Sequence, residues 1–316
     1  MDESTETCGR RFAPLGIPQT VEFRRAYREL IVTAPGLSES IGGAILYDET
    51  IRQTASDCAP IVQLLIKAGI VPGIKVDTGA KDMAGFPGEK ITEGLDGLRE
   101  RLAEYSQLGA RFAKWRAVIT IGDGIPTPAC LAANTQSLAR YAALCQEAGI
   151  VPIVEPEVLM DGTHTLERCA EVTEHVLRKL FSALYEQKVE LTGVILKPNM
   201  VLPGLKCSLQ EPVHEVAAAT VECFRRSVPA AVPVIAFLSG GQSAELATER
   251  LNAMNALYKN ELPWELAFSF ARAIQQPALE LWKGDPANVP QAQQALVCQA
   301  NRNRVARCGE YDPEIH

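Results

Sequence analysis

The 316-residue chain carries 31 basic and 38 acidic side chains, which gives it a formal net charge of −7. This acidic balance, without any run rich in Lys or Arg, argues against a nucleic-acid surface, because phosphate neutralisation needs clustered cations. The longest apolar stretch without charge, 227–243, is interrupted by Pro229, Pro233, Gly240 and Gly241, so it does not supply the roughly 20 apolar residues of a membrane helix.

Short apolar runs alternate with segments of helical period along almost the whole chain. We predict seven strands, at about 41–47, 69–77, 109–118, 151–158, 191–199, 232–240 and 264–271. Helices are predicted between them, for example over Thr92–Leu108 and Leu166–Gln187. In the first of these helices, apolar side chains recur at spacings of three and four residues, namely Leu95, Leu98, Leu102 and Tyr105.

Alternating strands and helices predict a parallel sheet, and nearly continuous apolar strands indicate that both of its faces are buried. The strands start at even intervals and no linker divides the chain, so we expect one domain over residues 1–316. A TIM (β/α)8-type barrel is favoured over an open doubly wound sheet. No G-x-G-x-x-G motif follows the first strands, which argues against a dinucleotide site.

Charged or polar residues stand at the carboxyl ends of four consecutive predicted strands. These residues are Lys75 with Asp77, Lys114 with Arg116, Glu155 with Glu157, and Lys197 with Asn199. The reacting groups of a parallel barrel come from these strand ends, and residues i and i+2 of a strand point to the same side. We therefore expect the side chains to converge in the barrel mouth. For any single strand, an ion pair that only closes the mouth remains the alternative.

A lysine cluster beside a carboxylate favours Schiff-base chemistry. Lysine attacks a carbonyl only when neutral, a neighbouring cation favours that form, and a carboxylate can shuttle protons. Lys197 ends a strand without charge and is the best candidate for the amine. The turn SGGQS at 239–243 frees backbone N–H groups for an anion, although a plain tight turn is the alternative, and Arg272 adds a cation. Together these features favour a phosphorylated carbonyl substrate.

Cysteine and histidine usage suggests a cytoplasmic enzyme without a metal. The nine cysteines are an odd number and form no C-x-x-C pair, as is typical of reduced thiols. The first residues, MDESTETCGRR, are acidic where a secretory signal would be basic. The four histidines share no spacing typical of metal ligands, so we expect no metal and no cofactor.

Six motifs together are similar to those of class I fructose-bisphosphate aldolase: DEST at 2–5, GIKVD at 73–77, FAKWR at 112–116, VPIVEPE at 151–157, LKPNMV at 196–201 and FLSGGQS at 237–243. The resemblance runs almost from end to end. It implies an eight-stranded barrel that reversibly cleaves fructose 1,6-bisphosphate into dihydroxyacetone phosphate and glyceraldehyde 3-phosphate, in glycolysis and gluconeogenesis. It also implies a metal-free homotetramer.

The resemblance also implies roles for individual residues. Lys197 resembles the Schiff-base lysine, Glu155 the general acid/base, and Glu157 the neighbour that assists iminium formation. Lys114 resembles the cation beside the amine, and Asp2 resembles the carboxylate that handles the C4 hydroxyl proton. Substrate-binding residues are implied at the C1 phosphate (Ser239, Gly240, Arg272), beside Lys114 (Arg116) and toward the opposite phosphate (Lys75, Ser4, Thr7, Arg10, Arg11).

Two alternatives stay open at this point. Other Schiff-base barrels, such as transaldolase or deoxyribose-phosphate aldolase, would lack this set of contiguous motifs. The second alternative is a truncated, inactive aldolase-like subunit or scaffold protein, because the family's N-terminal helix and first barrel strand have no counterpart before Asp2. This alternative predicts a gap between the strands at 41–47 and 264–271, a loosely held Asp2, and a poorly soluble chain with at most traces of activity.

Overall fold

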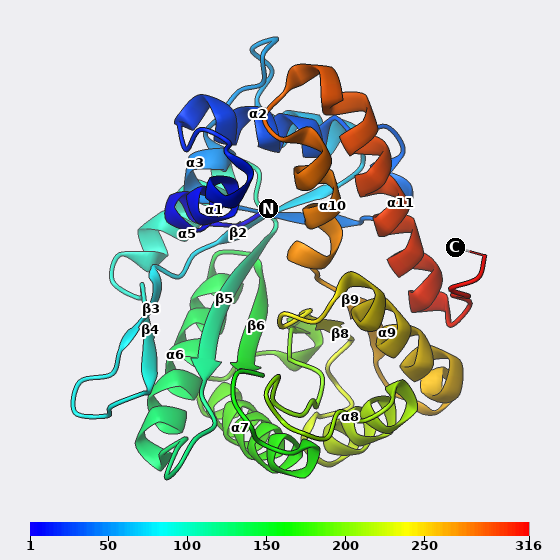
Figure 1. Cartoon of the computed structure of the whole chain (residues 1–316). Coiled ribbons are helices and arrows are strands. Elements are labelled where there is room, and N and C mark those ends of the chain that lie inside the picture. Colours follow the sequence, from blue (N-terminus) through cyan, green and yellow to red (C-terminus); the bar gives the residue numbers. More distant parts are fainter. Residues whose placement is uncertain (316) are drawn as a thin grey trace.

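The computed structural model describes residues 1–315, in which seven parallel strands form one curled sheet (Figure 1). Their order in the sheet follows the chain: β1 (Gly43–Leu46), β2 (Val71–Lys75), β5 (Phe112–Ile119), β6 (Val151–Val158), β7 (Ile195–Leu196), β8 (Val234–Phe237) and β9 (Glu265–Phe268). All six neighbouring pairs are parallel. Each of these seven strands overlaps one of the seven segments predicted from the sequence, and β5 passes its predicted end by one residue, so the predicted positions of these strands are confirmed.

Helices surround the strands as an outer layer (Figure 1). They are α1 (Thr5–Phe12), α2 (Val21–Val32), α3 (Asp48–Ile51), α4 (Ile61–Lys67), α5 (Leu98–Gln107), α6 (Pro128–Glu147), α7 (Leu166–Glu186), α8 (Val213–Ser227), α9 (Ala244–Tyr258), α10 (Arg272–Trp282) and α11 (Val289–Cys308). Five 3₁₀ turns complete them: η1 (Ala13–Leu15), η2 (Leu37–Glu39), η3 (Leu191–Gly193), η4 (Lys259–Glu261) and η5 (Pro286–Asn288). Among residues 1–315, no helix has both the length and the apolar character needed to cross a membrane.

Aromatic contacts fix the strands against these helices. Trp115 of β5 is fully buried, and its ring lies 5.6 Å from that of Tyr141 on α6. Phe237 of β8 stacks on Phe224 of α8 at 5.7 Å. Burying a large apolar side chain contributes about 1.5–3 kcal/mol. Such contacts therefore hold the strand ends in place, and the polar residues of the site lie at these ends.

One predicted helix start is wrong, and one hairpin was not predicted, for identifiable reasons. The predicted helix Thr92–Leu108 begins only at Leu98, because Gly94 and Gly97 adopt φ angles of +125° and +64°, which interrupt a helix. The residues before them form the antiparallel hairpin of β3 (Gly79–Asp82) and β4 (Lys90–Glu93), which the sequence pattern did not predict. The other helix predicted by name, Leu166–Gln187, is confirmed as α7.

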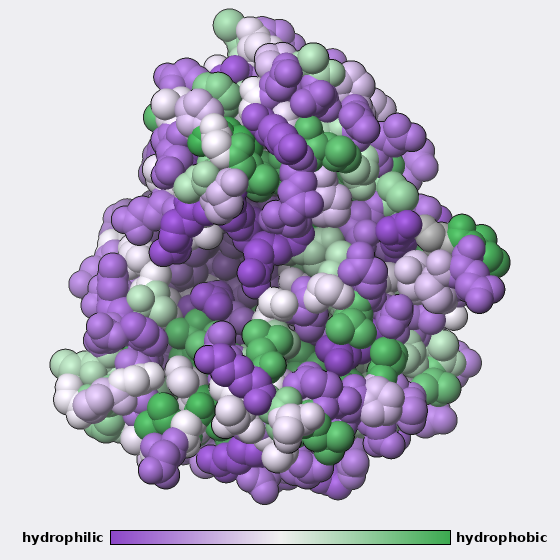
Figure 2. All heavy atoms as spheres, viewed as in Figure 1, coloured by the Kyte–Doolittle hydropathy of each residue, from purple (hydrophilic) through white to green (hydrophobic). Residues whose placement is uncertain are grey.

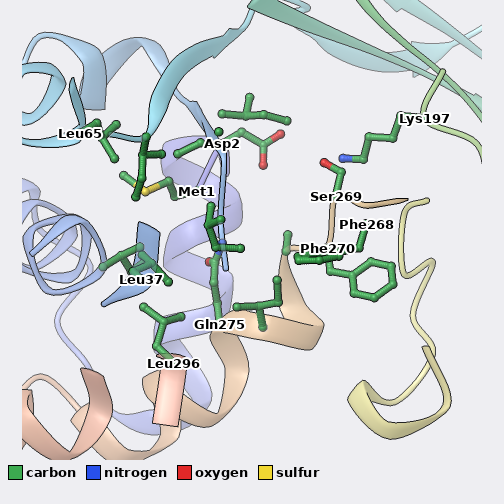
Figure 3. A pocket seen from close by; sticks show the side chains of 18 residues that line it. Met1, Asp2, Leu37, Leu65, Lys197, Phe268, Ser269, Phe270, Gln275 and Leu296 are labelled. Atoms are coloured by element: carbon green, nitrogen blue, oxygen red, sulfur yellow. The ribbon is translucent and has the colours of Figure 1, made fainter. Parts of the chain in front are cut away.

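The sheet is open between β1 and β9, each of which pairs with only one strand among the described residues. A cavity of about 120 Å³ lies between these two edges (Figure 3) and is lined mainly by apolar side chains such as Ile31, Leu37, Leu65, Ile70, Phe268 and Leu296. Met1 lines the same cavity and is 8% exposed. The predicted gap is therefore present, and the segment before α1 covers part of it.

Candidate active site

A hollow lined by hydrophilic residues opens near the centre of the face shown in Figure 2. It corresponds to a cavity of about 610 Å³ at the carboxyl ends of the strands. All fourteen site residues predicted from the sequence line this cavity: Asp2, Ser4, Thr7, Arg10, Arg11, Lys75, Lys114, Arg116, Glu155, Glu157, Lys197, Ser239, Gly240 and Arg272. The tertiary structure thus brings together residues from both ends of the chain.

Four of these residues form a continuous chain of charges. Lys197 Nζ, just beyond β7, lies 3.1 Å from Glu155 Oε1 on β6. Glu155 Oε2 lies 3.1 Å from Lys114 Nζ on β5, and Lys114 Nζ lies 2.7 Å from Asp2 Oδ2. Lys114 and Glu155 are each 3% exposed and Lys197 is 6% exposed. Amines and carboxylates therefore alternate along a buried row of side chains, where electrostatic interactions are stronger than in water.

The charges on this chain support one another. Burial alone would raise the pKa of Glu155, but Lys114 and Lys197 hold it below its ordinary value. Burial would lower the pKa of Lys114, whereas Asp2 and Glu155 raise it. Burial would also raise the pKa of Asp2, yet Lys114 holds it well below its usual range. Lys114 is therefore a fixed cation between two carboxylates. Glu155 Oε2 accepts no well-aligned hydrogen bond, so its ion pair with Lys114 is its contact with a protein cation.

Strand pleating explains how Glu157, the second acid of β6, reaches the cavity. On β6, Glu155 and Glu157 are two residues apart and point to the same side. The register sets Arg116 of β5 directly opposite Glu155. Arg116 forms an ion pair with Glu157, and its side chain stays 41% exposed while that of Glu157 is 9% exposed. Arg116 thus neutralises a buried acid and still reaches the open part of the cavity.

A glycine turn and an arginine form one wall of the cavity. Gly240 and Gly241 adopt φ angles of +60° and +94°, a backbone conformation that glycine tolerates best. A Cβ atom on Gly241 would lie 3.2 Å from Nη2 of Arg272, the first residue of α10. The glycine therefore allows the guanidinium to approach the turn. Backbone N–H groups and a fixed cation close together are suited to binding a phosphate.

The predicted residues of α1 form a second cationic wall with Lys75. Ser4 caps this helix, because its Oγ accepts a hydrogen bond from Thr7 N at 3.3 Å. Arg10 Nη2 donates to Thr7 Oγ1 at 3.2 Å. Lys75 Nζ, from β2, lies 2.6 Å from Asp77 Oδ1. Arg11 forms an ion pair with Glu3. The cavity thus has cations on α1 and β2 as well as at Arg272.

Three further cavity residues, Glu3, Lys81 and Ser269, were not singled out from the sequence. Lys81 belongs to the β3–β4 hairpin, which the sequence pattern did not predict. Ser269 directly follows β9, and its place after an apolar strand was the signal available. Glu3 lies within the DEST motif, but nothing in the sequence indicates its partners. Among residues 1–315, no group of three or more His, Cys, Asp or Glu side chains is arranged to hold a metal ion.

The expectation that Asp2 would be held loosely is wrong. Asp2 is ion-paired with Lys114, and the adjacent Glu3 is ion-paired with Arg28 of α2 at 2.7 Å. These two contacts fix the segment before α1 from both sides. The inactive-scaffold alternative also expected a loosely held Asp2, and these contacts contradict that part of it.

The ionised state of Glu3 predicts a pH dependence of stability. Burial would raise its pKa, but Arg28 and Arg11 lower it from 4.5 to about 2. A depressed native pKa gives stability that is present above the unfolded-state pKa and is lost as pH falls through the native value. We expect the free energy of unfolding, measured by denaturant titration, to decrease between pH 4.5 and about 2, and to decrease less steeply in Glu3→Gln. Equal slopes would contradict the ionised pair.

The chain is similar to known aldolases over its whole length. The family model described as "Glycolytic: Fructose-bisphosphate aldolase class-I" matches residues 1–316. The chain is 56% identical over 312 residues to the probable fructose-bisphosphate aldolase class 1 of Xanthomonas axonopodis pv. citri, an alignment that covers 98% of this chain and 93% of that protein. It is 50% identical over 310 residues to the cytosolic fructose-bisphosphate aldolase 6 of Arabidopsis thaliana, covering 98% and 86%.

A solved structure agrees with the sequence relatives. Fructose-bisphosphate aldolase from Plasmodium falciparum, crystallised in complex with TRAP and a small-molecule inhibitor, matches with a TM-score of 0.96 and 45% sequence identity. The match covers 98% of this chain and 90% of that one, which confirms the predicted TIM-type fold. Because the family model spans the chain and relatives share half or more of its residues, the chain belongs to the class I fructose-bisphosphate aldolase family.

Proposed function

We propose that this chain reversibly cleaves fructose 1,6-bisphosphate into dihydroxyacetone phosphate and glyceraldehyde 3-phosphate through a Schiff base on Lys197. The observation that carries the proposal is the buried chain of charges from Lys197 through Glu155 and Lys114 to Asp2. It supplies an amine, a proton carrier, a fixed cation and a second carboxylate within one cavity. Residues 1–316 act as one domain in this proposal.

The first half of the reaction forms the covalent intermediate. A proton passes from Lys197 to Glu155 across the 3.1 Å contact, which makes the amine nucleophilic and the carboxyl an acid. The amine attacks the C2 carbonyl carbon, and Glu155 donates its proton to the C2 oxygen. Glu155 then takes a proton from the attached nitrogen and passes it to the new hydroxyl, which leaves as water and gives the protonated iminium. Glu157, held by Arg116, assists this dehydration to the iminium.

The second half breaks the carbon–carbon bond. Asp2 accepts the proton of the C4 hydroxyl, the C3–C4 bond breaks, and its electron pair moves toward the iminium to form an enamine. The aldehyde leaves, and Asp2 releases the proton that it accepted, which reprotonates Glu155 through solvent. Glu155 delivers this proton to C3, and water then hydrolyses the iminium to release dihydroxyacetone phosphate and the Lys197 ammonium. Throughout these steps Lys114 stays charged between Asp2 and Glu155 and stabilises the negative charge that develops on oxygen.

A cleavage assay with purified protein tests the function. Fructose 1,6-bisphosphate should yield the two triose phosphates, and fructose 1-phosphate should be cleaved less efficiently because it lacks a ligand for the cations on α1 and β2. Chelators should leave the rate unchanged, since the proposed chemistry uses an amine in place of a Lewis acid. Absence of cleavage, or loss of activity with EDTA, would contradict the proposal.

The wall formed by Gly240, Gly241 and Arg272 is the proposed C1-phosphate site. We expect Arg272→Ala to weaken inorganic phosphate binding by about 1.5–3 kcal/mol, through loss of charge-assisted hydrogen bonds. Competition of phosphate with substrate measures this change. Arg99→Ala is the control, because Arg99 is 63% exposed and pairs with Glu147 outside the cavity. Equal phosphate inhibition of wild type and Arg272→Ala would exclude Arg272 as a phosphate ligand.

We further propose a cytoplasmic homotetramer as the working form. Plant relatives that are 48–50% identical are named cytosolic or cytoplasmic, and the family resemblance implies four subunits. Sedimentation equilibrium of the purified chain tests the assembly, and four protomers are expected. A monomer at micromolar concentration would contradict this part of the proposal without affecting the assigned chemistry.

A further inference from the structure

Asp2 belongs to no helix or strand, yet its carboxylate is fixed at 2.7 Å from Lys114 Nζ. The adjacent Glu3 is buried, and one of its carboxylate oxygens lies 2.7 Å from Arg28 Nη1. Arg28 Nη2 also donates to the backbone carbonyl of Glu3 at 3.3 Å. A single guanidinium on α2 therefore contacts both the side chain and the backbone of the residue beside Asp2.

Two other side chains complete the surroundings of Glu3. With its amide oriented so that both polar atoms find partners, Gln275 of α10 donates to Glu3 Oε1 at 2.9 Å. Arg11 approaches from the cavity side and forms an ion pair with the same carboxylate. Glu3 is thus held by side chains of three helices, α1, α2 and α10. The adjacent Asp2 contacts Lys114 on the sheet.

Stability alone does not account for the Glu3–Arg28 pair. Their side chains are 3% and 2% exposed, and moving two charges out of water costs about as much as their attraction returns. Apolar residues of similar volume would often be equally stable. Arg28 does not line the catalytic cavity, and the proposed chemistry uses neither residue. What the pair does supply is a fixed backbone position for Asp2.

We propose that Arg28, acting through Glu3, is a positioning residue that holds the Asp2 carboxylate against Lys114 for carbon–carbon cleavage. The inference rests on the proposed function, in which Asp2 takes the C4 hydroxyl proton. Without the pair, residues 1–4 would have no such anchor on α2. A misplacement of about 1 Å in a reacting group can lower a rate on the order of 100-fold. Iminium formation uses Lys197 and Glu155 and does not require Asp2.

This division of roles gives a specific signature for Arg28→Met. The kcat for cleavage of fructose 1,6-bisphosphate should fall on the order of 10- to 100-fold. Borohydride trapping of dihydroxyacetone phosphate on Lys197 should stay within about twofold of wild type, because the amine and Glu155 are undisturbed. Asp2→Asn should show the same division between cleavage and trapping.

Arg24 offers a matched control on the same helix, four residues before Arg28. It is 6% exposed and pairs with Glu49 at 2.6 Å, outside the catalytic cavity. Arg24→Met should lower the unfolding midpoint while leaving kcat and trapping within about twofold of wild type. A comparable fall in kcat for Arg24→Met would show that general loss of packing explains the effect, and the inference would be overturned.

Two combined variants keep the test decisive. Glu3→Leu with Arg28→Met removes both buried charges together, so it should fold even where the single variant does not, and it should show the same reduced cleavage with retained trapping. Adding Arg28→Met to Asp2→Asn should cause no further loss of kcat, because both changes remove one function. Parallel loss of cleavage and trapping, an unchanged kcat, or additive losses would overturn the inference. A wild-type chain that forms no trapped adduct would instead overturn the proposed function.

Discussion

Replacing Lys197 with methionine should abolish both covalent trapping and cleavage. In the proposed reaction the Lys197 amine forms the covalent bond with C2, so the loss of rate should be on the order of 10⁵-fold or more. Treatment with borohydride and dihydroxyacetone phosphate, followed by peptide mass mapping, measures the adduct. Wild type should carry it on Lys197, and Lys197→Met should carry none.

Two lysine variants serve as controls for this experiment. Lys67→Met changes an exposed lysine outside the catalytic cavity and should leave both trapping and cleavage unchanged. Lys75→Met removes a cavity lysine, so it should weaken substrate binding while the adduct still maps to Lys197. An adduct on Lys75 or Lys114 in wild type would show that the amine has been wrongly assigned.

Glu155→Gln should lower turnover by roughly 100-fold or more, the effect typical of losing a general acid/base. The substitution keeps the shape of a side chain that lies 3.1 Å from both Lys114 and Lys197. Substrate affinity should therefore change by only a small factor. Steady-state kinetics separate the two quantities, and a rise in KM at unchanged kcat would contradict the catalytic role.

The same variant needs a stability control, because it leaves two buried lysines without one of their counter-charges. We expect a lower unfolding midpoint for Glu155→Gln, so kinetics should be measured well below that temperature. Glu147→Gln is the matched surface control: Glu147 is 57% exposed and pairs with Arg99. It should retain wild-type turnover. A loss of activity in Glu147→Gln similar to that in Glu155→Gln would point to assay or folding effects.

The order of elements could be predicted from the sequence, because strand and helix periods are local properties. The segment 151–158 forms a strand with the predicted bounds, and α7 ends within one residue of its predicted end. The strand predicted at 191–199 shrinks to Ile195–Leu196, since η3 takes its first residues and Pro198 has no N–H to donate. The β3–β4 hairpin was not predicted because its strands are short and lie between the clearer patterns of strand β2 and helix α5.

The sequence by itself also singled out residues that line the catalytic cavity. Charge at the ends of apolar strands is costly unless it is used, so the sequence pattern alone singles out Lys114, Glu155 and Lys197. The glycine turn can also be recognised from the sequence. Two adjacent glycines, Gly240 and Gly241, follow a strand, and glycines let the backbone approach a ligand closely.

Only the tertiary structure decided how these residues pair. Strand alternation brings Glu155 and Glu157 to one side, but which lysine contacts which acid depends on register and on loops packed from distant segments. The contact of Asp2 with Lys114 and the buried pair of Glu3 with Arg28 join residues that no local pattern relates. Both contacts exist because α2 and the sheet enclose the segment before α1, and that enclosure is a property of the folded chain.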